Sequence, residues 1–317
     1  MAESGWMTLP TPVQYLGRGP AGQHLYIKRD DLAGPAFGGN KARILSVLLE
    51  DMRRQGGNCL ISYGSTRSNL NRTAACLCRR LSIPCAVITP QETEEEEEET
   101  FNSQMVRQMG VRQVRCRKTQ VAETVDEVME ACTSRGYRPY YVYGNRYGTG
   151  NEAVVRRAYR QAYREIRGWE EAEGVRLDAI FLASGTGMTQ GGLLAGRQEM
   201  GGSEQIIGIS AARDKEAGTA GVVRYAGSAA AEPEEVQFLT EYRCGGYGRY
   251  DASVEAAVQM AMERYGIPLD PVYTGKAFAG MLDVLSRGGC RMEHVLFLHT
   301  GGLPLYFDYL KSLQRRN

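Results

Sequence analysis

The sequence predicts an α/β protein of two lobes, each a mostly parallel, twisted sheet flanked by helices. Seven apolar or β-branched runs are typical of buried strands: residues 58–64, 84–90, 112–116, 140–144, 178–184, 205–211 and 294–300. Helical stretches such as 71–82 and 124–136 lie between them, with apolar residues three and four apart. Alternating strands and helices indicate parallel sheets covered on both faces. Seven strands over 317 residues suit two lobes better than one oversized sheet.

The overall charge and hydropathy exclude several classes of protein. Lys and Arg number 38 and Asp and Glu 37, so the basic excess that would indicate a nucleic-acid partner is absent. No apolar run approaches the roughly 18 residues that a membrane helix needs. Residues 1–17 lack the basic start and apolar run of a secretory signal. We therefore expect a cytoplasmic protein with no nucleic-acid or membrane partner.

The cysteines and histidines do not form a metal-binding pattern. The eight cysteines are scattered along the chain without a CxxC pair, at positions 59, 76, 78, 85, 116, 132, 244 and 290. The three histidines, His24, His294 and His299, do not cluster in the sequence. We expect reduced, structural thiols and no metal site.

Three segments are interpreted from their composition. The acidic run at 91–100, "QETEEEEEET", indicates a solvated helix start at the surface. Residues 159–178 are typical of an amphipathic surface helix with its end loop, without a further role. In the loop 241–251, glycines alternate with aromatic residues, which would let the backbone approach a ligand closely.

Four glycine- or hydroxyl-rich stretches follow or precede the predicted strands, at residues 38–41, 62–75, 183–196 and 299–302. Residues 183–196, "ASGTGMTQGGLLAG", follow a strand directly, and their backbone N–H groups could hold a phosphate at a helix N-terminus. Neither the Walker GK[ST] pattern nor the dinucleotide GxGxxG pattern is present. Ser68 is a helix N-cap by propensity.

A lysine, Lys41 in "GGNK", lies far upstream of this phosphate loop, at the start of a helical pattern. Its ordinary interpretation is a surface charge. A phosphate loop, a lysine at such a position and the lack of a metal set together favour a phosphorylated cofactor held covalently by an amine. Pyridoxal 5'-phosphate fits that description.

Five segments then occur in the order seen in a known enzyme family: "PTPVQYLGR", "LYIKRDDLAGPAFGGNKARIL", "GSTRSNLNRTAA", "LDPVYTGKAFAGM" and "FLHTGGLP". They resemble the D-cysteine desulfhydrase and 1-aminocyclopropane-1-carboxylate (ACC) deaminase family of pyridoxal-phosphate enzymes, from about residue 9 to residue 307. The resemblance implies a fold of the tryptophan-synthase-β type with the cofactor between the lobes. It implies a larger, cofactor-binding lobe of residues 1–43 and 153–317 and a smaller lobe of residues 44–152. It also implies a homodimer that acts on a small amino-acid substrate.

The resemblance assigns site residues by position. The catalytic set would be Lys41, Ser68, Tyr247 and Tyr273. Lys41 would form the Schiff base and move the α-proton, Ser68 would assist that transfer or hold the substrate carboxylate, and the tyrosines would flank the leaving group. The cofactor-binding set would be Lys41, Asn69, Gly185, Thr186, Gly187, Met188, Thr189, Thr274 and Thr300.

Two positions distinguish the branches of the family. ACC deaminases have glutamate after the second tyrosine and leucine after the last histidine, where this chain has Thr274 and Thr300. We therefore expect α,β-elimination from an amino acid with sulfur or a similar leaving group at Cβ, giving a 2-oxo acid and ammonia. The alternatives are a β-replacement synthase, an ACC deaminase-type ring opening and a non-catalytic homologue, the last disfavoured by the intact catalytic set.

Arg67 departs from the family pattern, in which glutamine commonly precedes the serine, and Leu70 and Met188 also differ. One interpretation of Arg67 is a second anion site for a larger or more acidic substrate, because guanidinium pairs well with carboxylate or sulfonate. The other interpretation is an arginine at the surface or between the lobes, and the sequence leaves both open.

Overall fold

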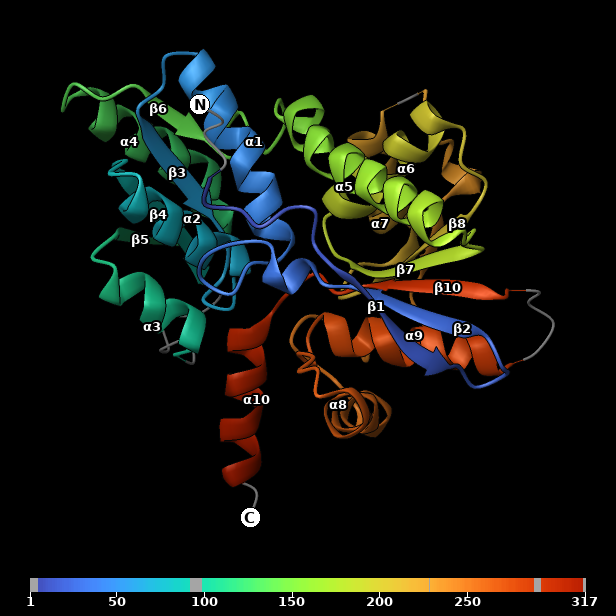
Figure 1. The fold of residues 1–317 in the computed structure, drawn as a ribbon. Coiled ribbons are helices and arrows are strands. Elements are labelled where there is room, and N and C mark those ends of the chain that lie inside the picture. The colour runs from blue at the N-terminus through green and yellow to red at the C-terminus, as the bar shows by residue number, and fades with distance from the viewer. Residues whose placement is uncertain (1–4, 92–98, 228, 288–291, 316–317) are drawn as a thin grey trace.

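The computed structural model describes residues 5–91, 99–227, 229–287 and 292–315, and it contains two sheets (Figure 1). Most of the acidic run at 91–100 lies outside these residues. The strands of the larger sheet are β1 (Val13–Arg18), β2 (His24–Lys28), β7 (Ala179–Ser184), β8 (Gln205–Ser210), β9 (Gln237–Leu239) and β10 (His294–Leu298). The strands of the smaller sheet are β3 (Cys59–Tyr63), β4 (Cys85–Gln91), β5 (Arg112–Arg117) and β6 (Pro139–Tyr141).

The strand order shows a mostly parallel architecture. The larger sheet runs β1-β2-β10-β7-β8-β9, and only the β1–β2 pair at its edge is antiparallel. The smaller sheet runs β5-β4-β3-β6 and is parallel throughout. Its central strand β3 and the central strand β7 of the larger sheet consist almost entirely of buried residues. Parallel strands covered on both faces have this continuous apolar pattern.

The helices cover both sheets. They are α1 (Asn40–Arg54), α2 (Asn69–Arg80), α3 (Phe101–Gln108), α4 (Val121–Thr133), α5 (Glu152–Glu173), α6 (Met188–Met200), α7 (Lys215–Ala226), α8 (Ala252–Tyr265), α9 (Thr274–Ser286) and α10 (Leu303–Gln314). Helices α5, α6 and α7 lie on one face of the larger sheet, and α8 and α9 lie on the other (Figure 1). The α/β fold class predicted from the sequence is confirmed.

The sequence did not predict three strands. β1 and β2 form an edge pair of mixed polar and apolar residues, and β9 has only three residues. The run 140–144 is a strand only up to Tyr141 and then turns. Each of the other predicted runs contains a strand. The lobe boundaries proposed above stay a prediction.

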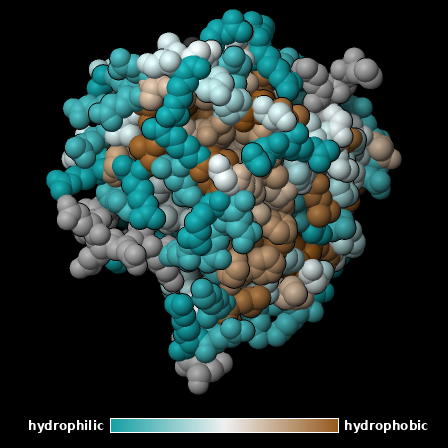
Figure 2. Space-filling view, turned by 90° about the vertical axis from the view of Figure 1, so that its left-hand side faces the viewer, coloured by the Kyte–Doolittle hydropathy of each residue, from teal (hydrophilic) through white to brown (hydrophobic). Residues whose placement is uncertain are grey.

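One face of the molecule carries a mixture of apolar and hydrophilic side chains (Figure 2). Figure 2 shows the side that faces left in Figure 1, where an apolar area is surrounded by hydrophilic side chains. The exposed large apolar residues of the described chain include Phe37, Phe307 and Leu310. Among the described residues, every helix is too short or too polar to cross a bilayer.

Candidate active site

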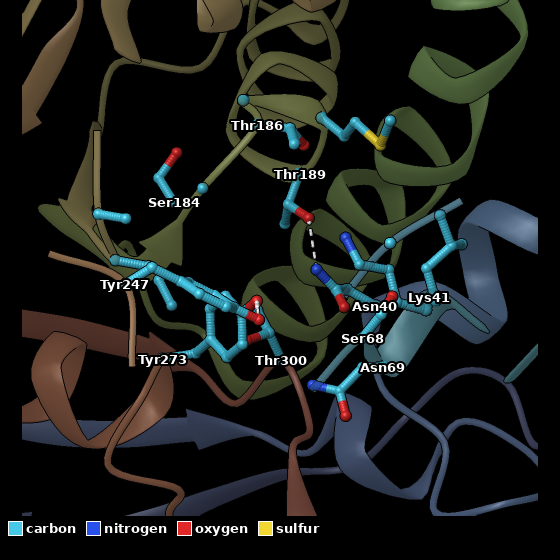
Figure 3. Close-up of a pocket in the computed structure, with 18 of the residues that line it drawn as sticks. Asn40, Lys41, Ser68, Asn69, Ser184, Thr186, Thr189, Tyr247, Tyr273 and Thr300 are labelled. Atoms are coloured by element: carbon cyan, nitrogen blue, oxygen red, sulfur yellow. Dashed lines mark hydrogen bonds between the residues drawn. The ribbon is translucent and has the colours of Figure 1, made fainter. Parts of the chain in front are cut away.

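A cavity of about 280 Å³ brings together residues from both sheets (Figure 3). Its lining comes from the start of α1, the segments 63–65 and 68–70, Tyr143, the segments 183–189 and 211–213, the two tyrosines Tyr247 and Tyr273, and residues 300–301. Two cationic side chains, Lys41 and Arg213, line the cavity, and no carboxylate is among its described lining residues. The cavity therefore suits a ligand that carries negative charge.

Lys41 is the second residue of α1, and the backbone before it is held from several sides. Gly39 has φ 89°, and a Cβ atom there would stand 2.8 Å from the Thr300 carbonyl oxygen. The Asn40 N–H donates to that same oxygen at 3.0 Å, and the Asn40 side chain donates to Thr189 Oγ1 at 3.0 Å (Figure 3). Only glycine permits this approach, so the GGNK sequence lets α1 begin directly beside residues 300–301 and α6.

The Lys41 amine points into the cavity rather than to the outer surface (Figure 3). Burial lowers its pKa to about 8, because the surrounding protein solvates an ammonium ion poorly. A lysine with such a pKa has a substantial neutral fraction near neutral pH, and only the neutral amine is a nucleophile or a base.

A buried ionic network holds α1 two residues further on, at Arg43. The Arg43 guanidinium donates to both carboxylate oxygens of Asp30, at 2.9 and 2.8 Å, and to both of Glu165 on α5, at 2.7 Å each. Lys28 donates to Glu165 at 2.8 Å, and the Tyr159 hydroxyl donates to Asp30 at 2.7 Å. Two cations and two carboxylates thus compensate one another where α1, α5 and β2 meet.

The network corrects the interpretation of residues 159–178 as a surface helix without a further role. Tyr159 and Glu165 lie on the inward face of α5 and join the buried network, while Arg160 and Arg164 on the outer face pair with Glu199. The helix is amphipathic as predicted, but its inner face is partly ionic.

The loop 185–189 ends β7 and begins α6. Gly187 has φ 91° and no side chain caps the helix, so its first N–H groups remain available to a ligand. A Cβ atom on Gly187 would lie 2.5 Å from the backbone of Gly221, which explains the glycine. The buried Ser184 hydroxyl beside the loop has no hydrogen-bond partner in the described residues.

The N-terminus of α2 forms the opposite wall of the cavity. Ser68 is the N-cap, as its propensity predicted, and its Oγ accepts from the Asn71 N–H at 3.2 Å. Asn71 in turn donates to the Gly64 carbonyl at 2.8 Å, which fixes the preceding turn. Asn69 lines the cavity, and its side-chain oxygen accepts from Asn102 at 3.1 Å. A helix N-terminus favours an anionic group.

The two tyrosines lie side by side with their hydroxyl groups toward the cavity (Figure 3). The Tyr273 hydroxyl donates to the Tyr247 oxygen at 3.0 Å, and Ser65 Oγ lies 3.4 Å from the same oxygen. Burial, and next the neighbouring Tyr247, raise the pKa of Tyr273 well above its usual value. Tyr273 therefore remains a protonated phenol over the physiological pH range and can donate a proton.

Asp270, which the sequence interpretation did not assign, holds Tyr273 in place. Its carboxylate accepts from the backbone N–H groups of Val272 and Tyr273 at 3.0 and 2.8 Å, and from the Thr274 hydroxyl at 2.7 Å. Asp270 thus accepts hydrogen bonds from the residues at the start of α9, although it lies four residues before the first residue of that helix. Burial raises the pKa of Asp270 to about 6 against the opposing effect of these bonds.

Lys276 was also unassigned, although it lies in the quoted segment "LDPVYTGKAFAGM". Its side chain is fully buried, and its ammonium group donates to three backbone carbonyls, those of Ala211 at 2.8 Å, Arg243 at 2.8 Å and Gly246 at 2.9 Å. Two of these carbonyls belong to the loop that carries Tyr247.

The structure gathers most of the predicted site residues around the cavity: Lys41, Ser68, Asn69, Gly185, Thr186, Gly187, Met188, Thr189, Tyr247, Tyr273 and Thr300. Thr274 does not line it, because its hydroxyl is fully buried against Asp270. Arg67 is not part of the lining either and lies beside Gly248. Arg213 lines the cavity instead, and no local motif indicated it, because it follows β8 far from the other segments.

Comparison with known proteins decides the family. Residues 7–301 match the family described as pyridoxal-phosphate dependent enzymes. The chain belongs to this enzyme family. A D-cysteine desulfhydrase of Klebsiella pneumoniae (strain 342) is 32% identical over 313 residues, which cover 95% of this chain and 94% of that relative. The family resemblance seen in the sequence is thus confirmed.

Solved structures agree with this assignment. The crystal structure of an ACC deaminase homologue superposes with a TM-score of 0.82 at 30% identity, covering 98% of this chain and 94% of that one. A hydrogen sulfide-producing enzyme from Fusobacterium nucleatum gives a TM-score of 0.66 at 14% identity, covering 93% and 96% of the two chains, which shows a shared fold. The enzyme is therefore a pyridoxal-phosphate enzyme of the D-cysteine desulfhydrase and ACC deaminase type.

The cavity fits this cofactor on its own evidence. A phosphate group requires N–H and hydroxyl donors, and the uncapped start of α6 and the unpartnered Ser184 hydroxyl provide them. A Cβ atom on Gly185 would meet only the Tyr273 ring, at 4.0 Å, so this glycine leaves room on the cavity side of the loop. The Lys41 amine lines the same cavity and has a lowered pKa, so it would be the amine that reacts with the aldehyde of the cofactor.

Proposed function

We propose that the enzyme catalyses α,β-elimination from an amino acid that carries sulfur at Cβ. One water molecule is consumed, the Cβ–S and Cα–N bonds break, and a thiol or sulfide, a 2-oxo acid and ammonia are released. The observation that carries the proposal is one cavity lined by a lysine with lowered pKa and by the hydrogen-bonded hydroxyls of Tyr273 and Tyr247. The D-cysteine desulfhydrase relatives support the class of substrate.

The cofactor supplies the chemistry that a polypeptide lacks: bound to the amino group, it withdraws electrons and makes the α-proton of the substrate acidic. Lys41 is the only amine among the described cavity-lining residues, and its neutral form can accept that proton. Its lowered pKa keeps a part of it neutral at the pH of the cell interior.

We assign to the tyrosine pair the stabilisation of the leaving group. A departing thiolate carries a negative charge, and Tyr273, which keeps its proton because its pKa is raised, can donate a hydrogen bond to that charge. Tyr247 accepts a hydrogen bond from Tyr273 and lies beside Ser65, so a proton lost by Tyr273 can be replaced along these hydroxyls.

The start of α2 is suited to the substrate carboxylate. Ser68 and Asn69 line the cavity at this N-terminus, where backbone N–H groups and the helix dipole favour an anion. Binding the carboxylate there would fix Cα near Lys41 on the neighbouring helix α1, shown close to Ser68 in Figure 3.

The test is product analysis with the Tyr273→Phe variant. The loaded enzyme is given D- and L-cysteine, β-chloro-D- and L-alanine, and ACC, and the 2-oxo acid, ammonia and sulfide are measured. Tyr273→Phe should lose activity on cysteine far more than on β-chloroalanine, because chloride leaves without a proton. Tyr147→Phe, at a 78% exposed tyrosine, serves as the matched control. Equal losses on both substrates would exclude the assigned role.

The same assay separates the alternatives. Product formation only with an added thiol or amine acceptor would indicate a β-replacement synthase. Release of a four-carbon 2-oxo acid from ACC would indicate the deaminase reaction, which the threonine at position 274 disfavours. From the family resemblance we also propose a homodimer, which sedimentation equilibrium would test.

A further inference from the structure

The loop between β9 and α8, residues 240–251, carries Tyr247 but has little structure of its own. Cys244, Gly245, Gly246 and Gly248 all have positive φ, and the backbone hydrogen bonds within the loop are turn-like bonds of 3.0 to 3.4 Å. Such a backbone loses much conformational entropy when it becomes ordered. Contacts from outside the loop must therefore hold Tyr247 where it lies.

Lys276 on α9 provides two of those contacts, and a third comes from the Tyr242 hydroxyl, which donates to Asp283 on α9 at 2.6 Å. The Lys276 ammonium group donates to the Arg243 carbonyl at 2.8 Å and the Gly246 carbonyl at 2.9 Å, one of which is on the residue immediately before Tyr247. The third bond of the ammonium group, at 2.8 Å, goes to Ala211, which lines the cavity at the end of β8. The Lys276 side chain thus connects the loop to the end of β8 in the cavity wall.

The chemistry of this contact requires a lysine in its charged form. An ammonium group has three N–H donors and no acceptor, which matches three carbonyl oxygens at 2.8 to 2.9 Å. All three acceptors are backbone carbonyls. Burial lowers the pKa of Lys276, while the carboxylates of Asp270 and Asp251 nearby oppose that effect and favour the charged form. A group buried at the cost of its hydration, yet making no contact with the cavity, is placed to hold the loop.

We propose that Lys276 is a positioning residue that acts through Tyr247: by clamping the carbonyls of Arg243 and Gly246, it keeps the Tyr247 hydroxyl beside that of Tyr273. The importance of this role for catalysis rests on the proposed function of the tyrosine pair. The contact between Lys276 and the loop does not rest on the proposed function, because it determines only whether the loop is ordered. The residue occurs in the segment "YTGKA", where only the tyrosine and threonine had been given roles.

The first experiment tests whether Lys276 orders the loop, and it does not depend on catalytic activity. Lys276→Met keeps the length and the apolar stem but removes all three donors. Hydrogen–deuterium exchange of the loaded enzyme should then rise in peptides from residues 240–251, and trypsin should cut at Arg243 and Arg249 faster than in the unmodified enzyme. Lys215→Met is the matched control, since Lys215 donates to the Phe238 carbonyl at 2.9 Å on β9 and does not contact the loop.

The second experiment tests the connection to Tyr247. If Lys276 acts through that hydroxyl, Lys276→Met and Tyr247→Phe should lower kcat to similar extents, and the double variant should be no worse than Tyr247→Phe alone. Cofactor affinity, followed by absorbance titration, should change little in all three variants. Losses of kcat that multiply in the double variant would overturn the proposal.

The two experiments fail separately. Unchanged exchange and cleavage in the loop of Lys276→Met would refute the clamp, whatever the activity. Increased exchange together with full activity of Tyr247→Phe would instead refute the catalytic role of the tyrosine pair and leave the clamp standing. If Lys276→Met does not fold, Lys276→Arg is measured instead, because it retains the charge with a different donor geometry. Increased exchange in residues 240–251 of that variant would support the clamp, and unchanged exchange would refute it.

Discussion

The buried ionic network behind α1 gives a quantitative prediction for Glu165→Gln. The substitution keeps the shape of the side chain but removes one of two carboxylates, so Lys28 and Arg43 must share Asp30. Arg43 is 2% exposed and Lys28 is 1% exposed, so water cannot replace the lost partner. Removing one member of a buried ion pair costs about 3–5 kcal/mol.

That cost converts into a melting temperature. An unfolding entropy of about 2.1 cal/mol/K per residue, over 317 residues, gives about 0.7 kcal/mol/K, so a loss of about 4 kcal/mol lowers Tm by about 6 °C. Scanning calorimetry measures this shift. Glu199→Gln is the control, because Glu199 also pairs with two arginines but on the exposed face of α5, where ion pairs are screened.

The comparison of the two variants is decisive. We expect Glu165→Gln to melt several degrees lower and Glu199→Gln to melt close to the unmodified protein. Equal Tm values for both variants would refute the inference that the network holds α5 against the start of α1.

Three further predictions concern the cavity. Because the pKa of Lys41 is about 8, the neutral fraction of the amine is about tenfold larger at pH 9 than at pH 7, and the cofactor-free enzyme should take up pyridoxal phosphate about tenfold faster at the higher pH. A rate that is flat with pH would contradict this. Asp270 accepts the hydrogen bonds that hold Tyr273, so kcat/KM should fall below about pH 6 as this carboxylate gains a proton. The Asp270→Asn variant should lower kcat about 10- to 100-fold, and its pH profile should lack the acidic limb. Retention of the limb in Asp270→Asn would assign it elsewhere. Ser68→Ala should cost about 1 kcal/mol of stability as a lost N-cap and should raise KM for the substrate; an unchanged KM would leave Ser68 as a cap alone.

The network also has a pH dependence with a definite sign. Burial opposes the charge of Asp30, but Arg43 and Lys28 outweigh it and hold the pKa of that carboxyl below its usual value. A carboxyl whose pKa is depressed by folding stabilises the protein above its unfolded-state pKa, near 4. This stabilisation is present at neutral pH and is lost as the pH falls through the folded-state pKa.

The fold was predictable where burial alone determines the pattern. The strands β3, β7 and β10 are buried on both faces, so they appear as continuous apolar runs between helices. The strands β1 and β9 were not predicted because one is a half-exposed edge strand and the other is too short to show a period. Periodicity needs several residues on a consistent face.

The site was predictable where it lies in local motifs, and not where folding assembles it. The glycine before Lys41 and the loop at 185–189 were recognisable from turn chemistry and from the family resemblance. Arg67 drew interest because it adjoins Ser68 in the sequence, yet Arg213 lines the cavity, because the ends of β7 and β8 meet at one edge of the sheet.

Buried polar partners were the hardest to foresee. Periodicity predicted the amphipathic helix α5 but could not indicate that Glu165 faces Arg43, more than a hundred residues away. Lys276 and Asp270 stood in a recognised segment, but a charged residue in a motif is equally consistent with a surface position. Only the three-dimensional arrangement shows that the partners of Lys276 are backbone carbonyls and that those of Asp270 are backbone N–H groups and the Thr274 hydroxyl.

The central claim is that the Lys41 amine is the one that binds the cofactor covalently. The most direct measurement is borohydride reduction of the loaded enzyme, followed by protease digestion and mass spectrometry of the peptides. We predict a phosphopyridoxyl group on Lys41 alone, and none anywhere in Lys41→Ala. A label on another lysine, such as the buried Lys28 or Lys276, or no label on a protein saturated with pyridoxal phosphate, would contradict the account.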